Sequence, residues 1–131
     1  MDFGINRKRA IVCAGSKGAG KACTRVLAGE GVNVTKVACG KESLEAAARE
    51  IRNPGACAAD NMHERPHGRD GNTGGKTLDE VARQRLRSML TGRFGEPFEF
   101  AQLCAYSCFA RASCITGQNF LMDGGSYPGT L

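Results

Sequence analysis

The sequence predicts an α/β fold, namely an incomplete Rossmann-like parallel sheet of about four strands with flanking helices. Short apolar or β-branched runs alternate with amphipathic helical patterns through the first 60 residues. A glycine-rich turn joins the first of these runs to the first helical pattern. Strands that alternate with helices need right-handed crossover connections, so the strands are expected to be parallel.

The first 60 residues are expected to supply most of this sheet. Strands are predicted at 10–13, 32–38 and 56–59, with an amphipathic helix in each interval. Gly29 and Gly31 are expected to end the first helix, and Ser43 to cap the second. This segment, 1–60, is predicted to be the N-terminal half of a dinucleotide-binding Rossmann domain.

The remainder is predicted to complete the same domain after a glycine-rich join at 61–76. In the segment 77–131, the T-x-x-E pattern from Thr77 to Glu80 is a capping box that opens an arginine-rich amphipathic helix. A second helix begins near Pro97. A last strand is predicted at 119–122, paired beside 10–13 as the fourth strand of the sheet.

The composition is that of one small soluble domain. The chain has 131 residues, with 41% hydrophobic and 24% charged, and its net charge is +5. It has neither an apolar run long enough for a membrane span nor a secretory segment at its start, so we expect a cytoplasmic protein. Its only dense basic run, Arg7 to Arg9, has no interleaved aromatic residues, which favours a solvated terminus over a nucleic-acid interface.

Two patterns suggest metal or disulfide chemistry; one fails on the number and spacing of its residues, and the other on helix geometry. The seven cysteines form an odd set without a C-x-x-C pair, so we interpret them as small buried hydrophobes, including Cys104 and Cys108, which would share one helix face. The stretch from His63 to His67 matches the H-E-x-x-H zinc signature, but Pro66 disfavours the helix that this motif requires. No metal site is therefore expected.

The strongest functional pattern is the glycine-rich turn AIVCAGSKGAGKAC at 10–23. A tight turn between a strand and a helix lets backbone N–H groups and the helix dipole meet a pyrophosphate. The alternative is that these glycines only turn the chain. The candidate cofactor-binding residues in this turn are Gly15, Ser16, Lys17, Gly18, Ala19 and Gly20.

This turn resembles the short-chain dehydrogenase/reductase family, particularly its members similar to 3-oxoacyl-carrier-protein reductase. Against the family pattern T-G-x-x-x-G-x-G, Cys13 and Ala14 replace the first two residues, whereas Gly18 and Gly20 keep the last two. The resemblance continues through VTKVACGKESLEAAAREIR and resumes in GRFGEPFEFAQLCAY and ITGQNFLMDGGSYPGTL. It implies NADP-dependent carbonyl reduction as the family activity, and a further cofactor contact, to adenine, at Asp60.

The charges near the turn favour NADP over NAD. Lys17 can reach an additional 2′-phosphate, whereas 38–40 offers no acidic residue for free ribose hydroxyls. The family often has an arginine where Cys39 stands, which would weaken this phosphate site.

The resemblance also shows what the chain lacks. The family's chemistry needs a serine and a Tyr-x-x-x-Lys pair, but Tyr106 is followed four residues later by Ala110, and Tyr127 by Leu131. No catalytic residues are therefore expected, and the chain is interpreted as an internally truncated member. Three hypotheses remain: an oxidoreductase-derived protein that still binds a nicotinamide dinucleotide, an interaction piece that forms a homo- or hetero-oligomer with relatives, and a non-functional remnant.

Overall fold

The computed structural model describes residues 2–51, 57–58 and 77–129. The chain divides into two compact units, Met1–Arg65 with Pro97–Gln118, and Pro66–Glu96 with Asn119–Leu131. The glycine-rich join at 61–76 lies outside the described residues, and the predicted division at 60 and 77 stays a prediction. Among the described residues, no helix combines the length and apolarity that crossing a bilayer requires.

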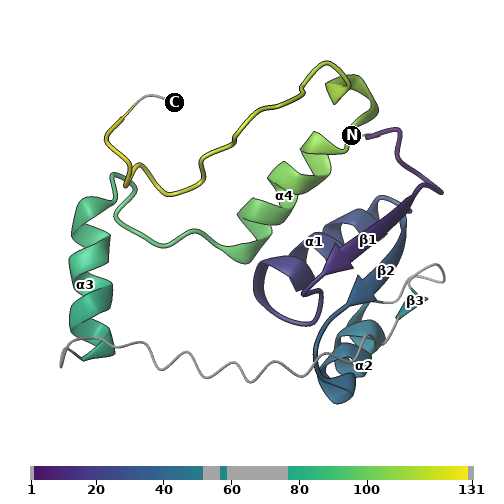
Figure 1. The fold of residues 1–131 in the computed structure, drawn as a ribbon, viewed down its shortest axis with the longest axis horizontal. Helices are drawn as coiled ribbons and strands as arrows, with labels where there is room; N and C mark the ends of the chain where they lie inside the picture. The colour runs from purple at the N-terminus through teal and green to yellow at the C-terminus, as the bar shows by residue number, and fades with distance from the viewer. Residues whose placement is uncertain (1, 52–56, 59–76, 130–131) are drawn as a thin grey trace. The chain divides into compact units, whose positions relative to one another are not determined.

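The first unit contains a parallel sheet in the order β1-β2-β3, formed by β1 (Arg9–Cys13), β2 (Asn33–Val37) and β3 (Cys57–Ala58) (Figure 1). Ile11 lies opposite Thr35 in the first ladder, and Thr35 lies opposite Cys57 in the second. The prediction of an α/β fold with parallel strands is therefore confirmed.

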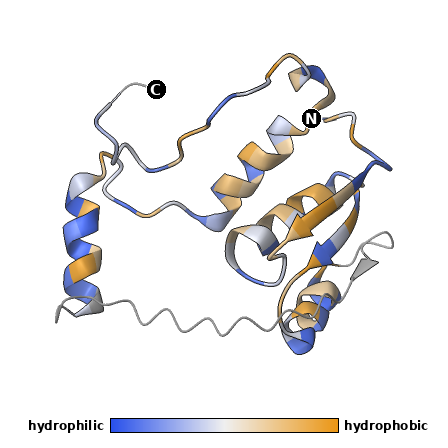
Figure 2. Cartoon of the chain, viewed as in Figure 1, coloured by the Kyte–Doolittle hydropathy of each residue, from blue (hydrophilic) through white to orange (hydrophobic). Residues whose placement is uncertain are grey.

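Three α-helices belong to the same unit: α1 (Gly18–Gly29), α2 (Lys41–Glu50) and α4 (Pro97–Ser107), which is followed by the 3-10 helix η1 (Ala110–Ala112). Helix α1 packs against α4, where Ala101 and Ala105 are fully buried. Figure 2 shows hydrophobic colouring along β1, α1 and much of α4. The small side chains of Ala101 and Ala105 let α1 and α4 approach closely. The main core cluster consists of Ile5, Leu27, Ala28, Val32, Val34, Ile51 and Ala105.

The two faces of the sheet differ sharply in burial. Successive residues of a strand point to opposite faces of the sheet. Val34 therefore faces the helices, while Ile11 faces away from them. Val34 is fully buried, whereas Ile11 is 74% exposed. Within the described part of the chain, β1 pairs with β2 alone, so one edge of the sheet lacks a ladder partner.

The second unit contains α3 (Leu78–Ser88). Its predicted capping box is confirmed, since the Glu80 N–H donates to the Thr77 hydroxyl and the Thr77 N–H donates to the Glu80 carboxylate, at 3.3 and 2.9 Å. In the same unit, the Asp123 carboxylate accepts from the Gly125 and Tyr127 N–H groups, and the Thr91 N–H donates to the Gly124 carbonyl.

The strand predicted at 119–122 is not formed. These residues adopt no regular secondary structure, and Phe120, Leu121 and Met122 are each close to half exposed. The described sheet ends at β1, and the chain after Met122 is held by the turn at Asp123 instead of by a ladder. An apolar run becomes a strand only when another backbone accepts and donates its hydrogen bonds, and that partner is missing here.

Candidate functional site

The glycine-rich turn connects the carboxyl end of β1 to α1, and two of its residues have left-handed backbone conformations. Ala14 and Gly18 both have positive φ angles, of 56° and 53°. The Gly15 N–H donates to the Val37 carbonyl at 3.3 Å, which fastens the turn to the end of β2. The turn is therefore anchored to both strands whose carboxyl ends flank it, the usual place for a ligand in a sheet of this type.

Two of its glycines are closely packed against neighbouring atoms. A Cβ at Gly20 would lie 2.8 Å from the Ala14 carbonyl carbon and 3.2 Å from the Cys13 oxygen. A Cβ at Gly15 would lie 3.1 Å from the Lys36 side chain. Since interiors are close-packed, a side chain at Gly20 would push the turn away from the helix. If the glycines only turned the chain, this close approach of Gly20 to Ala14 would not be needed.

The amino end of α1 is open toward the turn. Its N-cap residue, Lys17, makes no side-chain capping bond, and the first turn of the helix contains no acidic residue. A Cβ at Gly18 would meet no atom within 4 Å. Helix amino ends attract anions through their N–H groups and dipole. The residues present therefore fit a pyrophosphate in charge and in space.

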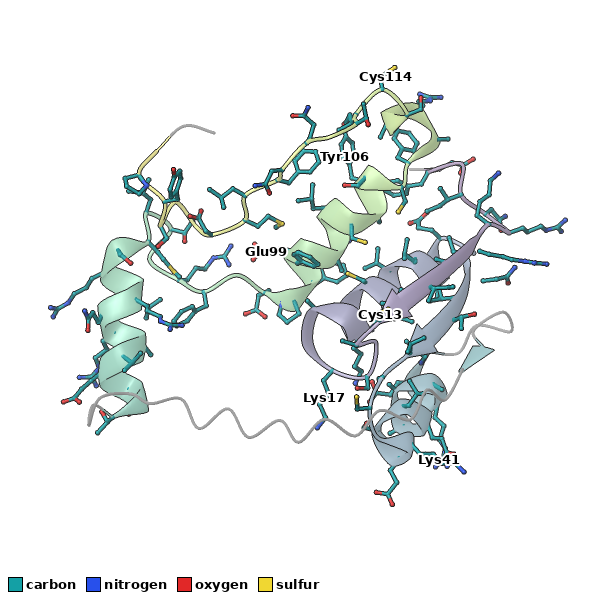
Figure 3. The ribbon with its side chains drawn as sticks, in the orientation of Figure 1. Cys13, Lys17, Lys41, Glu99, Tyr106 and Cys114 are labelled. Atoms are coloured by element: carbon teal, nitrogen blue, oxygen red, sulfur yellow. The ribbon has the colours of Figure 1, made fainter. Side chains whose placement is uncertain are left out.

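The structure brings the predicted turn residues together at this helix end. Gly15 is buried, Ser16 and Gly20 are half-buried, and Lys17, Gly18 and Ala19 are exposed. Figure 3 shows the Lys17 side chain extending from the turn. The other predicted contact, Asp60, lies outside the described residues, as do His63 and His67. Their roles stay predictions.

The sequence reasoning missed a buried amine beside the turn. Lys36 on β2 has no exposed surface, and among the described residues its Nζ atom has no hydrogen-bond partner. Burial lowers the pKa of Lys36, repulsion from Lys21 lowers this pKa further, and Glu50 partly opposes the change. The alternation in NVTKV, with Val34 and Lys36 two residues apart, was the signal that could have revealed this inward-facing lysine.

An ion pair joins the two helices near this amine. The Lys21 ammonium on α1 lies 2.6 Å from the Glu50 carboxylate on α2. The hydrogen bond from Lys21, and then its charge, lower the pKa of Glu50. Lys21 is held in this ion pair. Lys36 is therefore the lysine at this place that has no hydrogen-bond partner among the described residues.

The end of β2 supplies a second cation. Gly40, with φ of 93°, is the N-cap of α2, and the Ser43 hydroxyl donates to its carbonyl at 2.9 Å. The prediction that Ser43 caps this helix is wrong, because Ser43 lies inside the first turn. Lys41, the exposed first residue of α2, was missed as a candidate although only residues 38–40 separate it from β2 (Figure 3).

The interpretation of the cysteines as buried is mostly wrong. Among those whose side chains are described, Cys23 is buried and Cys104 half-buried, while four are exposed, namely Cys13, Cys39, Cys108 and Cys114. In the described ranges, no three His, Cys, Asp or Glu residues are arranged to hold a metal ion.

Neither tyrosine lies in an arrangement typical of the family's catalytic pair. Tyr106 is on α4, about half exposed, with its ring 6.4 Å from that of Phe109. Tyr127 is also about half exposed and follows the Asp123 turn. Neither has a lysine four positions later in the sequence.

Comparison with known proteins shows which fold and which sequence segment the chain shares with them. No family model matches the chain. A tropinone reductase homologue of Arabidopsis thaliana is 45% identical over 47 residues, which is 36% of this chain and 18% of that protein. A short-chain dehydrogenase/reductase of Brucella melitensis, described as a glucose/ribitol dehydrogenase, superposes with a TM-score of 0.75 over 97% of this chain and 99% of that one, at 12% identity. The L-sorbose reductase of Gluconobacter frateurii, solved with NADPH and L-sorbose, is 31% identical over 49% of this chain and 25% of its own, with a TM-score of 0.43.

The chain has the Rossmann fold, and a 47-residue segment of it is similar to a tropinone reductase homologue. The Brucella structure supports the Rossmann fold alone, since its sequence identity is low. The identity to the plant homologue is local and covers 36% of this chain. The matched segment spans less than a fifth of the plant protein, so the activity of such whole proteins is not carried over with it.

Proposed function

We propose that this chain is an internally truncated short-chain dehydrogenase/reductase, of the 3-oxoacyl-carrier-protein-reductase-like type, that retains an NADP(H) site. The observation that supports this most strongly is the approach of Gly20 to Ala14, which brings the turn against the uncapped amino end of α1. Such an approach serves a bound pyrophosphate, whose negative charge the helix end stabilises. The family's carbonyl reduction is impaired or lost with the missing catalytic residues.

Different residues would bind different parts of the cofactor. The N–H groups of the turn and the first turn of α1 would hold the pyrophosphate, and Lys17 and Lys41 would hold the 2′-phosphate. The proposed contact of Asp60 with adenine completes the set. When bound, NADPH would supply a hydride, but the chain supplies no Tyr-x-x-x-Lys pair to protonate a carbonyl.

NADP is proposed in preference to NAD because of the charges around the carboxyl end of β2. Lys17 and Lys41 are exposed cations on the turn and at the start of α2. Residues 38–40 contain no carboxylate of the kind that binds free ribose hydroxyls in NAD sites. A cytoplasmic location, where this cofactor is abundant, is proposed with it.

A titration with NADPH and NADH tests the proposal. Cofactor fluorescence and the melting temperature are followed as each cofactor is added up to millimolar concentration. The proposal predicts saturable binding that is tighter for NADPH, with this preference reduced about tenfold in Lys17→Ala. Arg49→Ala, in the last turn of α2, removes the same charge away from the turn and serves as the control. Absence of any change at millimolar NADPH contradicts the proposal.

The bare face of the sheet supports a second candidate, an interaction piece that docks on a full-length relative. Ile11 is 74% exposed on that face, and β1 lacks a ladder partner on one side within the described residues. Size-exclusion chromatography with and without the relative tests this candidate. A mixed species that is lost in Ile11→Glu would support it, and separate elution of the two proteins would refute it.

A further inference from the structure

A cavity of about 450 Å³ opens in the first unit at the amino end of β1. Its buried lining residues, here called the floor, are Ile5, Leu27 and Val32, which are all apolar. Its exposed lining residues, here called the rim, include the cations Lys8 and Arg9. In the part of the chain that the structure describes, no acidic residue lines the cavity. An apolar floor is therefore combined with a positively charged rim.

Backbone hydrogen bonds hold the walls of this cavity in place. The Ala110 N–H donates to the Phe3 carbonyl at 3.1 Å, and the Asn33 N–H donates to the Lys8 carbonyl at 2.8 Å. The rings of Phe3 and Phe109 also meet edge to face, with their centroids 5.3 Å apart. The N-terminal segment is thus fastened both to the start of β2 and to the residues after α4. The cavity is therefore preformed, as most small-molecule sites are.

The two cations on the rim are available to an anion. Neither Lys8 nor Arg9 forms an ion pair with another of the described residues. The nearest acidic residue along the chain is Asp2, whose carboxylate accepts from the Gly4 N–H at 2.8 Å and does not line the cavity. A single negative charge at the mouth of the cavity would therefore meet attraction without competition from a lining carboxylate.

The lining also restricts what the rest of the ligand can be. Apart from the two cations, the Cys108 thiol is the only polar side-chain group among the lining residues that the structure describes. A sugar or a second charge on the floor would leave polar atoms without hydrogen-bond partners, which is costly. The floor therefore suits an alkyl chain.

We propose that this cavity binds a straight-chain carboxylate of about eight to ten carbons, with its alkyl chain on the floor and its carboxylate at Lys8 and Arg9. The size of the ligand follows from the volume. If each non-hydrogen atom takes the ~30 Å³ of one water molecule in the liquid, the cavity holds at most about 15 such atoms. Octanoate and decanoate stay below this limit.

The proposed carboxylate site is independent of the proposed cofactor site. It lies at the amino end of β1, whereas the glycine-rich turn follows the carboxyl end of that strand. Binding of the carboxylate should therefore neither need NADPH nor displace it.

The experiment titrates the full chain with hexanoate, octanoate and decanoate below their micelle concentrations, by calorimetry and by NMR of the amides. Each added methylene should tighten binding about fourfold, because it removes apolar surface from water. The amides of Ile5, Val32 and Ala110 should shift, while those of α3 should not. Octanol, which has the chain of octanoate without its charge, should bind about tenfold more weakly.

Two variants separate the rim from the floor. Removing both rim cations, by Lys8→Gln together with Arg9→Gln, should weaken octanoate about tenfold and leave octanol unchanged. Arg49→Gln removes a cation on α2, away from the cavity, and should bind octanoate like the wild type. Ala10→Leu places a larger side chain in the lining and should weaken both ligands. Circular dichroism checks that each variant is folded.

Several outcomes would overturn the proposal, and the first two need no variant. Equal affinities for octanoate and octanol would show that the rim cations do not recognise the carboxylate. Equal affinities for hexanoate and decanoate would show that the floor does not hold the alkyl chain. Displacement of NADPH by octanoate would place the ligand at the turn instead. A dimer that decanoate dissociates, seen by size-exclusion chromatography, would assign the cavity to a second copy of the chain.

Discussion

Gly20 in the first turn of α1 lies so close to Ala14 that a Cβ would approach the Ala14 carbonyl carbon to 2.8 Å. Ala14 itself has a positive φ angle, of 56°. This single approach fixes where the helix end meets the turn, and with it the group of N–H donors on which the proposed cofactor site depends.

Gly20→Ala should therefore destabilise the protein, whereas the same change at the other end of α1 should not. A methyl group at position 20 must displace the turn, at a cost of about 1–3 kcal/mol in the free energy of unfolding. Gly29→Ala is the matched control, because its Cβ would meet no atom within 4 Å, and a helical alanine is favoured over glycine by up to about 1 kcal/mol. Urea unfolding of both variants measures the difference. Equal stabilities would show that the contact is not tight.

Lys36→Met should stabilise the protein and alter its dependence on pH. The folded-state pKa of Lys36 lies below its ordinary value of 10.5, so between the two values the unfolded state binds more protons. The free energy of unfolding should then rise with pH through that interval, and the penalty should be complete below the folded pKa. Removing the buried amine should gain about 1 kcal/mol at neutral pH.

The measurement for Lys36 is urea unfolding from pH 7 to pH 10.5, with Lys41→Met as the control. Lys41 is exposed, so its substitution should leave both the stability and the slope as they are in the wild type. A wild-type slope retained in Lys36→Met would assign the pH dependence to other groups.

Thr77→Ala should loosen the start of α3. The hydroxyl of Thr77 accepts from the Glu80 N–H, and none of the α3 residues whose burial is described is fully buried, so this helix depends strongly on its cap. Loss of an N-cap side chain costs about 1 kcal/mol. Amide hydrogen exchange of the first turn should quicken about fivefold, while Ser88→Ala at the other end should leave that turn unchanged. Unchanged exchange in Thr77→Ala would contradict the cap's role.

The chain should not reduce carbonyls by the family mechanism. Incubation with NADPH and a range of 3-oxoacyl and simple ketone substrates should consume no more cofactor than a sample without protein. The reason is the missing Tyr-x-x-x-Lys pair, which normally protonates the carbonyl. Steady NADPH consumption that depends on both protein and substrate would show that another group replaces the tyrosine.

Local patterns predicted most of the fold correctly. The glycine-rich turn, the helix beginning at Pro97 and the Thr77 capping box appear in the structure where their residues predicted them. Each depends on interactions within a few residues along the chain. The run at 119–122 failed for the opposite reason, because a strand depends on a distant backbone that the described sheet does not supply.

The candidate site was predictable in the turn but not beside it. The spacing of Gly15, Gly18 and Gly20 predicted the turn. The burial of Lys36 instead depends on how β2 packs beneath α1 and the turn. The packing of α4 against α1 likewise joins segments about 80 positions apart in the sequence. No local pattern carries that information.

The central claim, a retained NADP(H) site on the glycine-rich turn, is tested most directly by NMR titration of the ¹⁵N-labelled chain with NADP⁺. The account predicts saturable shifts of the amides of 15–20 and of Lys41, with smaller shifts for NAD⁺. Amides of α3 serve as the internal control and should not move. Shifts that are absent, or that spread evenly over the chain at millimolar NADP⁺, would contradict the account.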